Sequence, residues 1–119
     1  MFAHGSRVES ANEAVRSVAA ELAKAGGFRV EAAFLELGVP DLPAAAARLV
    51  EAGVDSITVI PYFLTLGLHM ERDLPPLVES ISCAYNGLPI AVTPPLDGHP
   101  ALVQVLLDRA MSASHSNIS

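Results

Sequence analysis

Residues 56–63 read Ser-Ile-Thr-Val-Ile-Pro-Tyr-Phe, a nearly continuous run of β-branched and aromatic side chains. Such a run is typical of a central strand that helices cover on both faces of a parallel sheet. Shorter apolar runs at 2–3, 29–35 and 89–93 are separated from it by helical patterns, and the repeat of about 30 residues fits strand–helix–strand units. The spacing predicts an α/β fold: one doubly wound, flavodoxin-like domain of about four parallel strands with helices on both faces.

The composition fits a globular domain and excludes several functions. The chain has 119 residues, 51% of them hydrophobic and 17% charged, so it can form one core and does not have the composition of a disordered protein. Its net charge is −6 without a basic cluster, which argues against nucleic-acid and anionic-membrane partners. The longest apolar stretch, 57–68, is shorter than a membrane span. Because Cys83 is the only cysteine and the first residues lack a signal-peptide pattern, we expect a cytoplasmic protein.

Two predicted helices carry clear start and stop signals. Ser10, with Glu13 three residues later, has the pattern of a capping box. Gly27 is expected to end that helix because glycine readily adopts the left-handed conformation. Asp41 is expected to cap the second helix. The side chains predicted to face the sheet are Ala11, Val15, Val18, Ala19 and Leu22 in the first helix, and Leu42, Ala46, Leu49 and Val50 in the second.

Two further helices are expected towards the C-terminus. The third covers 73–84 and contains Cys83, which we expect to be buried as a small apolar residue. The last helix runs from Pro100 to residue 110. The domain therefore covers 1–111, and the small polar residues of 112–119 are expected to form a disordered tail. The side chains of the last helix that are predicted to face inward are Leu102, Val103, Leu106 and Leu107.

Polar side chains gather at the carboxyl ends of the predicted strands, the edge at which open parallel sheets bind ligands. His4 follows the first strand, Glu36 the second and His69 the third. Two imidazoles and a carboxylate form a mixed nitrogen and oxygen set that suits divalent cobalt, nickel, iron or zinc, and the same groups accept protons near neutral pH. The alternative is that each histidine is a surface loop residue hydrogen-bonded to backbone. Other residues of this edge are Ser6, Arg7, Thr65, Glu71, Arg72, Asp97 and His99.

Some of these residues have two possible roles. Arg7 and Arg72 can hold the carboxylates of a substrate through paired hydrogen bonds, but an arginine that is solvated in a loop is an equal alternative. His99, between Gly98 and Pro100, has the position of a helix-entry residue. A role for His99 in the site is therefore the less favoured interpretation.

Four sequence motifs lie at or near the ends of the predicted strands. They are Phe2-Ala3-His4-Gly5-Ser6-Arg7, Ala33-Phe34-Leu35-Glu36-Leu37, Ile60-Pro61-Tyr62-Phe63-Leu64 and Gly67-Leu68-His69-Met70-Glu71-Arg72-Asp73-Leu74-Pro75. In this order and spacing they resemble the small class II tetrapyrrole chelatases, most closely the short, single-domain sirohydrochlorin cobaltochelatases. Later segments at 94–100 and 106–109 also match, so the likeness covers nearly the whole chain except the tail.

The resemblance implies a metal chelatase, a lyase that inserts a divalent metal into sirohydrochlorin for cobalamin or sirohaem. Cobalt is the first candidate, with iron or nickel as alternatives. The family's metal-handling histidines fall on His4 and His69, its catalytic residues, and its carboxylate falls on Glu36. No organic cofactor is expected, because the metal is a substrate, and the expected protein partner is a second copy in a homodimer. The candidate substrate-binding residues are Ser6, Arg7 and Arg72.

The chemistry of metal insertion fits these residues independently of the resemblance. Insertion removes two pyrrole protons and replaces the water ligands of the metal with ring nitrogens. Neutral histidines can hold a metal weakly and accept protons, and their affinity for the metal should fall as they become protonated. We therefore expect His4 and His69, with Glu36, to present the metal to one face of the macrocycle and to accept its protons.

One departure from the family and two alternatives stay open at this stage. Only Met1–Ala3 precede His4, whereas the family has several more apolar residues there. We therefore expect the first strand to be truncated, which would loosen the position of His4 and affect activity more than fold. A non-catalytic protein that binds metal or tetrapyrrole is one alternative function. A signalling or flavin-binding domain is the other, although 60–63 lacks the aspartate of a phosphate-accepting receiver and 4–9 has a single serine.

Overall fold

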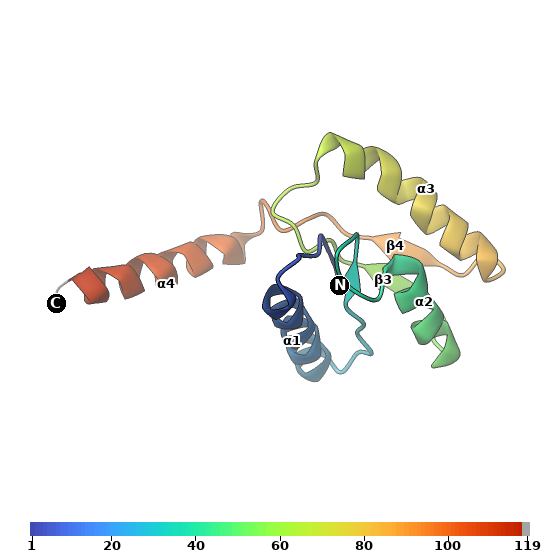
Figure 1. Ribbon diagram of the computed structural model, residues 1–119, viewed down its shortest axis with the longest axis horizontal. Coiled ribbons are helices and arrows are strands. Elements are labelled where there is room, and N and C mark those ends of the chain that lie inside the picture. The colour runs from blue at the N-terminus through green and yellow to red at the C-terminus, as the bar shows by residue number, and fades with distance from the viewer. Residues whose placement is uncertain (118–119) are drawn as a thin grey trace.

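The computed structural model describes residues 1–117, with side chains for residues 1–113 (Figure 1). Four short strands form two parallel pairs, β1 with β2 and β3 with β4. A bridge between Phe2 and Pro61 joins the two pairs edge to edge, because the Phe2 N–H donates to the Ile60 carbonyl oxygen and the Tyr62 N–H donates to that of Phe2. The spatial order is therefore β2, β1, β3, β4. The strands are β1 (Phe2–Ala3), β2 (Ala33–Phe34), β3 (Ile57–Val59) and β4 (Ile90–Val92).

The parallel α/β architecture is confirmed, but the strands are shorter than the apolar runs that predicted them. β2 occupies only the end of the run at 29–35, because β1 pairs with no more than Ala33 and Phe34. The run at 56–63 was expected to be covered on both faces. Instead, Ile57 and Val59 are buried while Thr58, between them, is exposed. One face of β3 therefore lacks a cover within the described part of the chain.

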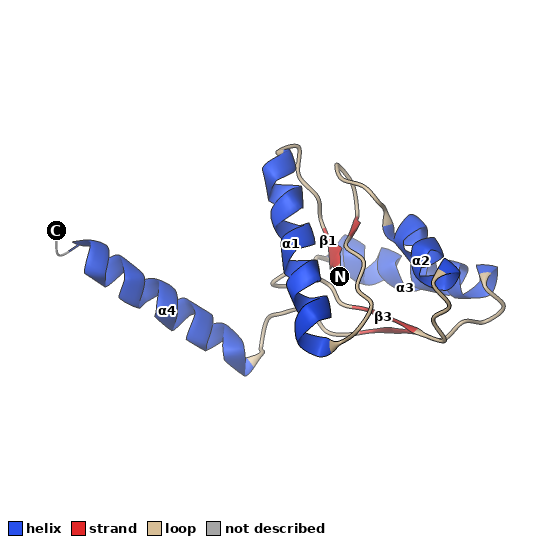
Figure 2. Ribbon diagram, turned by 90° about the horizontal axis from the view of Figure 1, so that it is seen from below, coloured by secondary structure: helices blue, strands red, loops and turns tan. Residues whose placement is uncertain are grey.

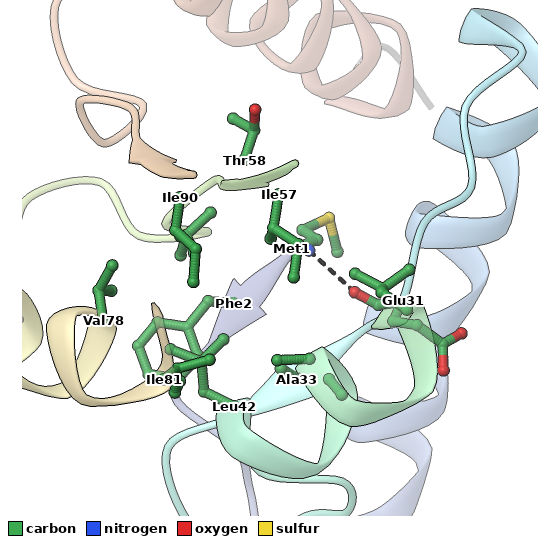
Figure 3. Close-up of a pocket in the computed structure, with 14 residues that line it drawn as sticks. Met1, Phe2, Glu31, Ala33, Leu42, Ile57, Thr58, Val78, Ile81 and Ile90 are labelled. Atoms are coloured by element: carbon green, nitrogen blue, oxygen red, sulfur yellow. Dashed lines mark hydrogen bonds between the residues drawn. The ribbon is translucent and has the colours of Figure 1, made fainter. Parts of the chain in front are cut away.

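The helices lie on both sides of the strands. Figure 2 shows α1 on one side and α2 and α3 on the other. The core lies between the strands and the second side, where Phe2, Ala33, Ala46, Leu74 and Ile81 are buried. It contains a small apolar cavity of about 30 Å³ (Figure 3). The helices are α1 (Glu9–Gly26), α2 (Leu42–Glu51), α3 (Leu68–Ala84) and α4 (Pro100–Asn117).

Most of the helix signals are confirmed, and one is wrong. Gly27 ends α1 with a φ of 70°, and the Asp41 carboxylate accepts a hydrogen bond from the Ala44 N–H at 3.0 Å at the start of α2. The capping box at Ser10 does not form. α1 begins at Glu9 without a side-chain cap, and Glu13 pairs with Arg16 instead, at 2.9 Å.

The predicted start of α3 is too late. The helix was predicted to cover 73–84, whereas it begins at Leu68 and contains Pro75 and Pro76 in its interior. Both prolines are exposed, so the helix carbonyl groups that they leave without an N–H donor can reach water. His69 and Arg72 therefore lie on a helix and not in a loop. Cys83, expected to be buried, is exposed near the end of the same helix.

The last helix departs from the expected packing. α4 continues to Asn117, past the predicted end at residue 110, and projects from the body as an arm (Figure 1). The molecule consequently measures 59 × 31 × 29 Å. The prediction that its apolar residues face inward is wrong, because Val103, Leu106 and Leu107 are 52–68% exposed and Leu102 is only partly buried. In the described residues, no helix has the length and apolar character needed to cross a membrane.

Candidate active site

His4 and Glu36 meet at the carboxyl edge of β1 and β2. The His4 Nε2 atom lies 3.7 Å from the Glu36 Oε1 atom, and both side chains are more than half exposed. They come from neighbouring strands, because His4 follows β1 directly and Glu36 comes two residues after β2. The prediction that parallel strands would bring these two residues to one edge agrees with this geometry.

Backbone contacts hold the two loops that carry His4 and Glu36. The Glu36 N–H donates to the His4 carbonyl oxygen at 3.1 Å. Gly5 lies against the Glu36 carbonyl so closely that a Cβ atom at residue 5 would overlap its oxygen. Gly5 also has a φ of 95°, a conformation that other residues rarely adopt. The pair therefore depends on the absence of a side chain at residue 5.

A buried asparagine ties the same loops together from below. Asn12 on α1 is 1% exposed. Its Oδ1 accepts a hydrogen bond from the Ser6 N–H at 2.8 Å, and its Nδ2 donates to the carbonyl oxygens of Ser6 at 2.8 Å and Leu37 at 2.9 Å. These bonds link the loop after β1 to the loop after β2. The sequence analysis missed Asn12, although a polar residue one turn before the sheet-facing Val15 is a signal for such a role.

The hydrogen bond at Nδ1 of His4 decides how its ring can act. Nδ1 lies 3.2 Å from the Gly5 carbonyl oxygen. Because a carbonyl oxygen only accepts, Nδ1 carries the proton of this bond, and Nε2 of the neutral ring has a free lone pair. That lone pair and the Glu36 carboxylate face each other. Such an arrangement suits a metal ion between them.

The hydrogen bond at Nδ1 of His69 has the opposite direction to that at Nδ1 of His4. It lies in the first turn of α3, where Arg72 Nη2 is 3.1 Å from its Nδ1. A guanidinium only donates, so Nδ1 is the acceptor and the proton of the neutral ring is on Nε2. Arg72 also donates to Asp73 at 2.9 Å, and this hydrogen bond holds the pKa of the Asp73 carboxyl below its ordinary value. The ionised Asp73 thus keeps Arg72 beside His69.

The structure does not assemble all of the predicted ligands. Within the described residues, no three His, Cys, Asp or Glu side chains lie close enough together to hold a metal ion. His4 and Glu36 form a two-residue pair, and His69 lies outside it. The metal set of His4, His69 and Glu36 stays a prediction.

The other candidate residues differ in their surroundings. The Ser6 Oγ atom accepts a hydrogen bond from the Val8 N–H at 3.0 Å, so this side chain shapes its own loop. Arg7 and Glu71 are exposed, as a residue that meets a substrate would be. His99 is confirmed as a helix-entry residue, because its Nδ1 accepts a hydrogen bond from the Ala101 N–H at 3.0 Å.

Exposed apolar side chains surround this edge, and the sequence analysis did not identify them. Leu35 and Leu37 flank Glu36, Leu64 lies in the loop after β3, and Leu68 starts α3. Their exposure ranges from 39% to 84%. The Phe63 ring lies edge to face with the His4 ring, at 6.5 Å between centroids. Exposed apolar side chains near polar groups are a common feature of surfaces that bind a ligand or a partner.

Comparisons with known proteins agree with this picture. The CbiX family model matches residues 1–113. The sirohydrochlorin cobaltochelatase of Sulfolobus acidocaldarius is 33% identical over 110 residues, which are 92% of this chain and 86% of that protein.

Two crystal structures extend the likeness to the fold. A CbiX protein from Marinobacter aquaeolei VT8 is 28% identical, with a TM-score of 0.81 over 97% of this chain and 94% of that one. The sirohydrochlorin chelatase SirB from Bacillus subtilis subspecies spizizenii, in complex with cobalt, is 25% identical with a TM-score of 0.78. That match covers 93% of this chain but 48% of SirB, so the chain spans about half the length of SirB.

Proposed function

The chain belongs to the CbiX family, and from that premise we propose that it inserts a divalent metal into sirohydrochlorin. The observation that supports this most strongly is the His4–Glu36 pair, with Nε2 of His4 3.7 Å from a carboxylate oxygen. Cobalt is the first metal to consider, because relatives of this chain are cobaltochelatases and one similar structure contains cobalt. Iron and nickel suit the same nitrogen and oxygen ligands.

The His4–Glu36 pair can bind a metal weakly enough to release it. A divalent ion that lies about 2.0–2.2 Å from a histidine nitrogen and from a carboxylate oxygen fits between two atoms 3.7 Å apart. Two protein ligands leave the remaining coordination positions to water. A chelatase must release the metal to four ring nitrogens, so this incomplete set of protein ligands suits a metal that is a substrate.

The same pair can accept the protons that insertion sets free. When the metal binds the ring, two pyrrole N–H groups lose their protons and the products are the metallated ring and two protons. His4 Nε2 can accept one proton, and Glu36 then stabilises the imidazolium at short range. We assign the second acceptor to His69, once Arg72 has released its Nδ1 atom. In this account Arg72 moves to a peripheral carboxylate of the substrate, which a guanidinium binds well.

The exposed apolar side chains define where the macrocycle would lie. Leu35 and Leu37 flank Glu36 in the chain, and Leu68 precedes His69. Leu64 follows Phe63, whose ring lies against that of His4. Burying their surface under a flat ring would contribute about 25 cal/mol per Å² of apolar area. Arg7, which is exposed, is a second candidate to contact a substrate carboxylate. No organic cofactor takes part in this proposal.

We also propose that two copies of the chain form the working unit, in the cytoplasm. SirB, which has the same fold, is about twice as long as this chain. Two copies of the chain would supply an equivalent amount of structure. The exposed thiol of Cys83, the only cysteine, is compatible with a reducing compartment.

An anaerobic spectrophotometric assay with sirohydrochlorin tests the proposed activity. The purified chain is mixed with the tetrapyrrole and with cobalt, iron or nickel, and metallation is followed by the change in the absorption spectrum. We expect insertion of at least one metal, and a rate at least about 100-fold lower for His4→Ala. His99→Asn, which keeps a capping acceptor at another histidine of this edge, should retain full activity. Stoichiometric binding without insertion would instead favour a non-catalytic carrier.

A further inference from the structure

Arg16 on α1 contacts the loop after β2, residues 35–40, which carries Glu36. The Nη2 atom of Arg16 donates a hydrogen bond to the Val39 carbonyl oxygen at 3.1 Å. The Val39 side chain is 74% exposed, so the loop is held at this residue by its backbone. Arg16 thus links α1 to the loop a few residues beyond Glu36.

Two carboxylates of α1 hold the other end of the guanidinium. The Nη1 atom of Arg16 donates to Glu9 at 2.7 Å and to Glu13 at 2.9 Å. The hydrogen bond from Arg16 holds the pKa of Glu9 below its ordinary value, so Glu9 stays ionised well below neutral pH. A network of several charges stabilises more than an isolated surface pair does. Because Nη1 is bound to α1 itself, Nη2 is left to bind the loop.

The Phe34 ring supports both the guanidinium and the loop. Phe34, the last residue of β2, is buried. The Cζ atom of Arg16 lies 5.2 Å from the centroid of the Phe34 ring, within the range of a cation–π interaction. Gly38 of the loop lies against the same ring, since a Cβ atom at residue 38 would be 2.9 Å from the Phe34 Cγ atom. The loop therefore folds back over the end of β2, and Arg16 fastens it there.

The same loop contains a backbone conformation that leucine rarely adopts. Leu37 has a φ of 58°, in the left-handed region. A strained conformation of this kind persists only where surrounding contacts hold it. Asn12 donates to the Leu37 carbonyl oxygen at 2.9 Å, and Arg16 donates to that of Val39 at 3.1 Å. Asn12 and Arg16 are one helical turn apart, so α1 fixes two carbonyl groups of the loop, one on each side of Gly38.

We infer that Arg16 is a positioning residue for metal binding, which keeps Glu36 opposite His4 by fixing the loop at Val39. The inference rests on the proposed function and adds a residue that acts through the loop. The side chains of His4 and Glu36 are both more than half exposed. Their 3.7 Å separation therefore depends on the backbone that carries them, and release of Val39 would let the loop beside Glu36 relax.

The arrangement requires a guanidinium. Its N–H groups lie in one plane and point in fixed directions, so Arg16 can serve two carboxylates and a carbonyl oxygen at once. The ammonium of a lysine is a single point charge, which Glu9 and Glu13 would attract away from Val39. Arg16→Lys therefore keeps the positive charge on α1 and removes the bridge to the loop.

Cobalt binding to Arg16→Lys tests the positioning role. Isothermal titration calorimetry with cobalt alone gives the dissociation constant, and the spectrophotometric assay gives the insertion rate. We expect a dissociation constant about tenfold higher and a rate about tenfold lower than in the unmodified chain, because small displacements of functional groups are costly. Arg16→Met, which removes the ion pairs as well, should weaken cobalt binding at least as much. Circular dichroism shows whether each variant is folded.

A second substitution separates positioning from a general loss of stability. In a Glu36→Ala background the proposed ligand is already absent, so Arg16→Lys should weaken cobalt binding no further. Arg48→Lys is the matched control, because Arg48 donates to Glu31 at 3.4 Å and this pair does not include the loop. Gly87→Ala introduces backbone strain in the turn between α3 and β4. Both controls should bind cobalt as tightly as the unmodified chain.

Three results bear on the inference in different ways. Unchanged cobalt affinity in Arg16→Lys would overturn it. A further loss of affinity in the Glu36→Ala background would also overturn it, because Arg16 would then act independently of Glu36. An unmodified chain that binds cobalt but does not insert it would refute the proposed function alone, and weaker cobalt binding by Arg16→Lys would still support the positioning role.

Discussion

The two histidines of the candidate active site are held in opposite ways. His4 donates from Nδ1 to the Gly5 carbonyl oxygen and keeps Nε2 free beside Glu36. His69 accepts at Nδ1 from Arg72, so its remaining ring nitrogen carries the proton. Two histidines at the same edge of a sheet can therefore differ in which ring nitrogen carries the proton. His4 is ready to bind a metal or a proton, whereas His69 becomes ready only when Arg72 leaves it.

The surroundings of His4 are held more firmly than those of His69. The loop of His4 is fixed by Asn12, Gly5 and backbone contacts to the loop of Glu36. His69 lies in an exposed first turn, and the hydrogen bond from Arg72 is exposed as well. Exposed polar contacts of this kind contribute little free energy, typically below about 1 kcal/mol. The His4 half should therefore be sensitive to packing changes, and the His69 half should be tolerant of them.

Gly5→Ala should produce the largest effect. The new Cβ atom would overlap the Glu36 carbonyl oxygen and would have to adopt a φ of 95°. We expect the free energy of unfolding to fall by at least about 2 kcal/mol, and chelation to fall by at least about 100-fold because the His4–Glu36 pair separates. Urea denaturation and the insertion assay measure the two effects.

Gly87→Ala is the matched control for Gly5→Ala. Gly87 has a φ of 80° but no atom within 4 Å of an added Cβ atom. Its replacement should cost about 1 kcal/mol from backbone strain alone and should leave chelation unchanged. Equal losses of activity in the two variants would contradict the role of Gly5 in bringing the two loops together.

Asn12→Ala should have the next largest effect. It would leave the part-buried Ser6 N–H and Leu37 carbonyl groups without their side-chain partner, which costs about 1 kcal/mol. We expect kcat to fall by roughly tenfold as the loops loosen, since small displacements of catalytic groups are costly. Ser17→Ala, on the solvent side of the same helix, should change neither quantity. A full-rate Asn12→Ala enzyme would show that the loops keep their geometry without it.

The sequence predicted the His4–Glu36 pair but not the state of either histidine. Strand order alone brings His4 and Glu36 to one edge, because parallel strands end on the same side. The tautomer of His4 depends on its contact with Gly5, and that of His69 depends on its contact with Arg72. Each of these contacts joins residues close together in the chain and follows from the local backbone geometry. Arg72 reaches His69 only because α3 begins at Leu68, whereas the sequence predicted a start at residue 73.

The position of α4 could not be predicted from its apolar spacing alone. Its apolar spacing does indicate a buried helix, and the sequence analysis assigned it to the sheet of its own chain. A pattern of side chains specifies that a face is to be covered, but not which molecule covers it. Val18 and Thr58 are likewise exposed, although both were predicted to be covered.

Arg72→Ala should give the smallest effect. Loss of the guanidinium frees Nδ1 of His69 and removes the hydrogen bond that lowers the pKa of Asp73, so that pKa should rise towards its ordinary value. Because the contact is exposed, we expect at most about a fivefold change in the KM for the metal. Nuclear magnetic resonance of the Asp73 carboxyl and steady-state kinetics give the two readouts. Arg7→Ala, which removes another exposed arginine of the edge, should leave the Asp73 pKa unchanged.

The most direct measurement of the difference between the two histidines is a cobalt titration of the protein labelled with ¹⁵N-histidine. Long-range proton–nitrogen spectra report which ring nitrogen carries the proton and which histidine the metal perturbs first. Before metal is added, His4 should show the Nδ1–H tautomer and His69 the Nε2–H tautomer. Cobalt should then perturb His4 at lower concentrations than His69. Perturbation of His69 first, or of both histidines together, would contradict the account.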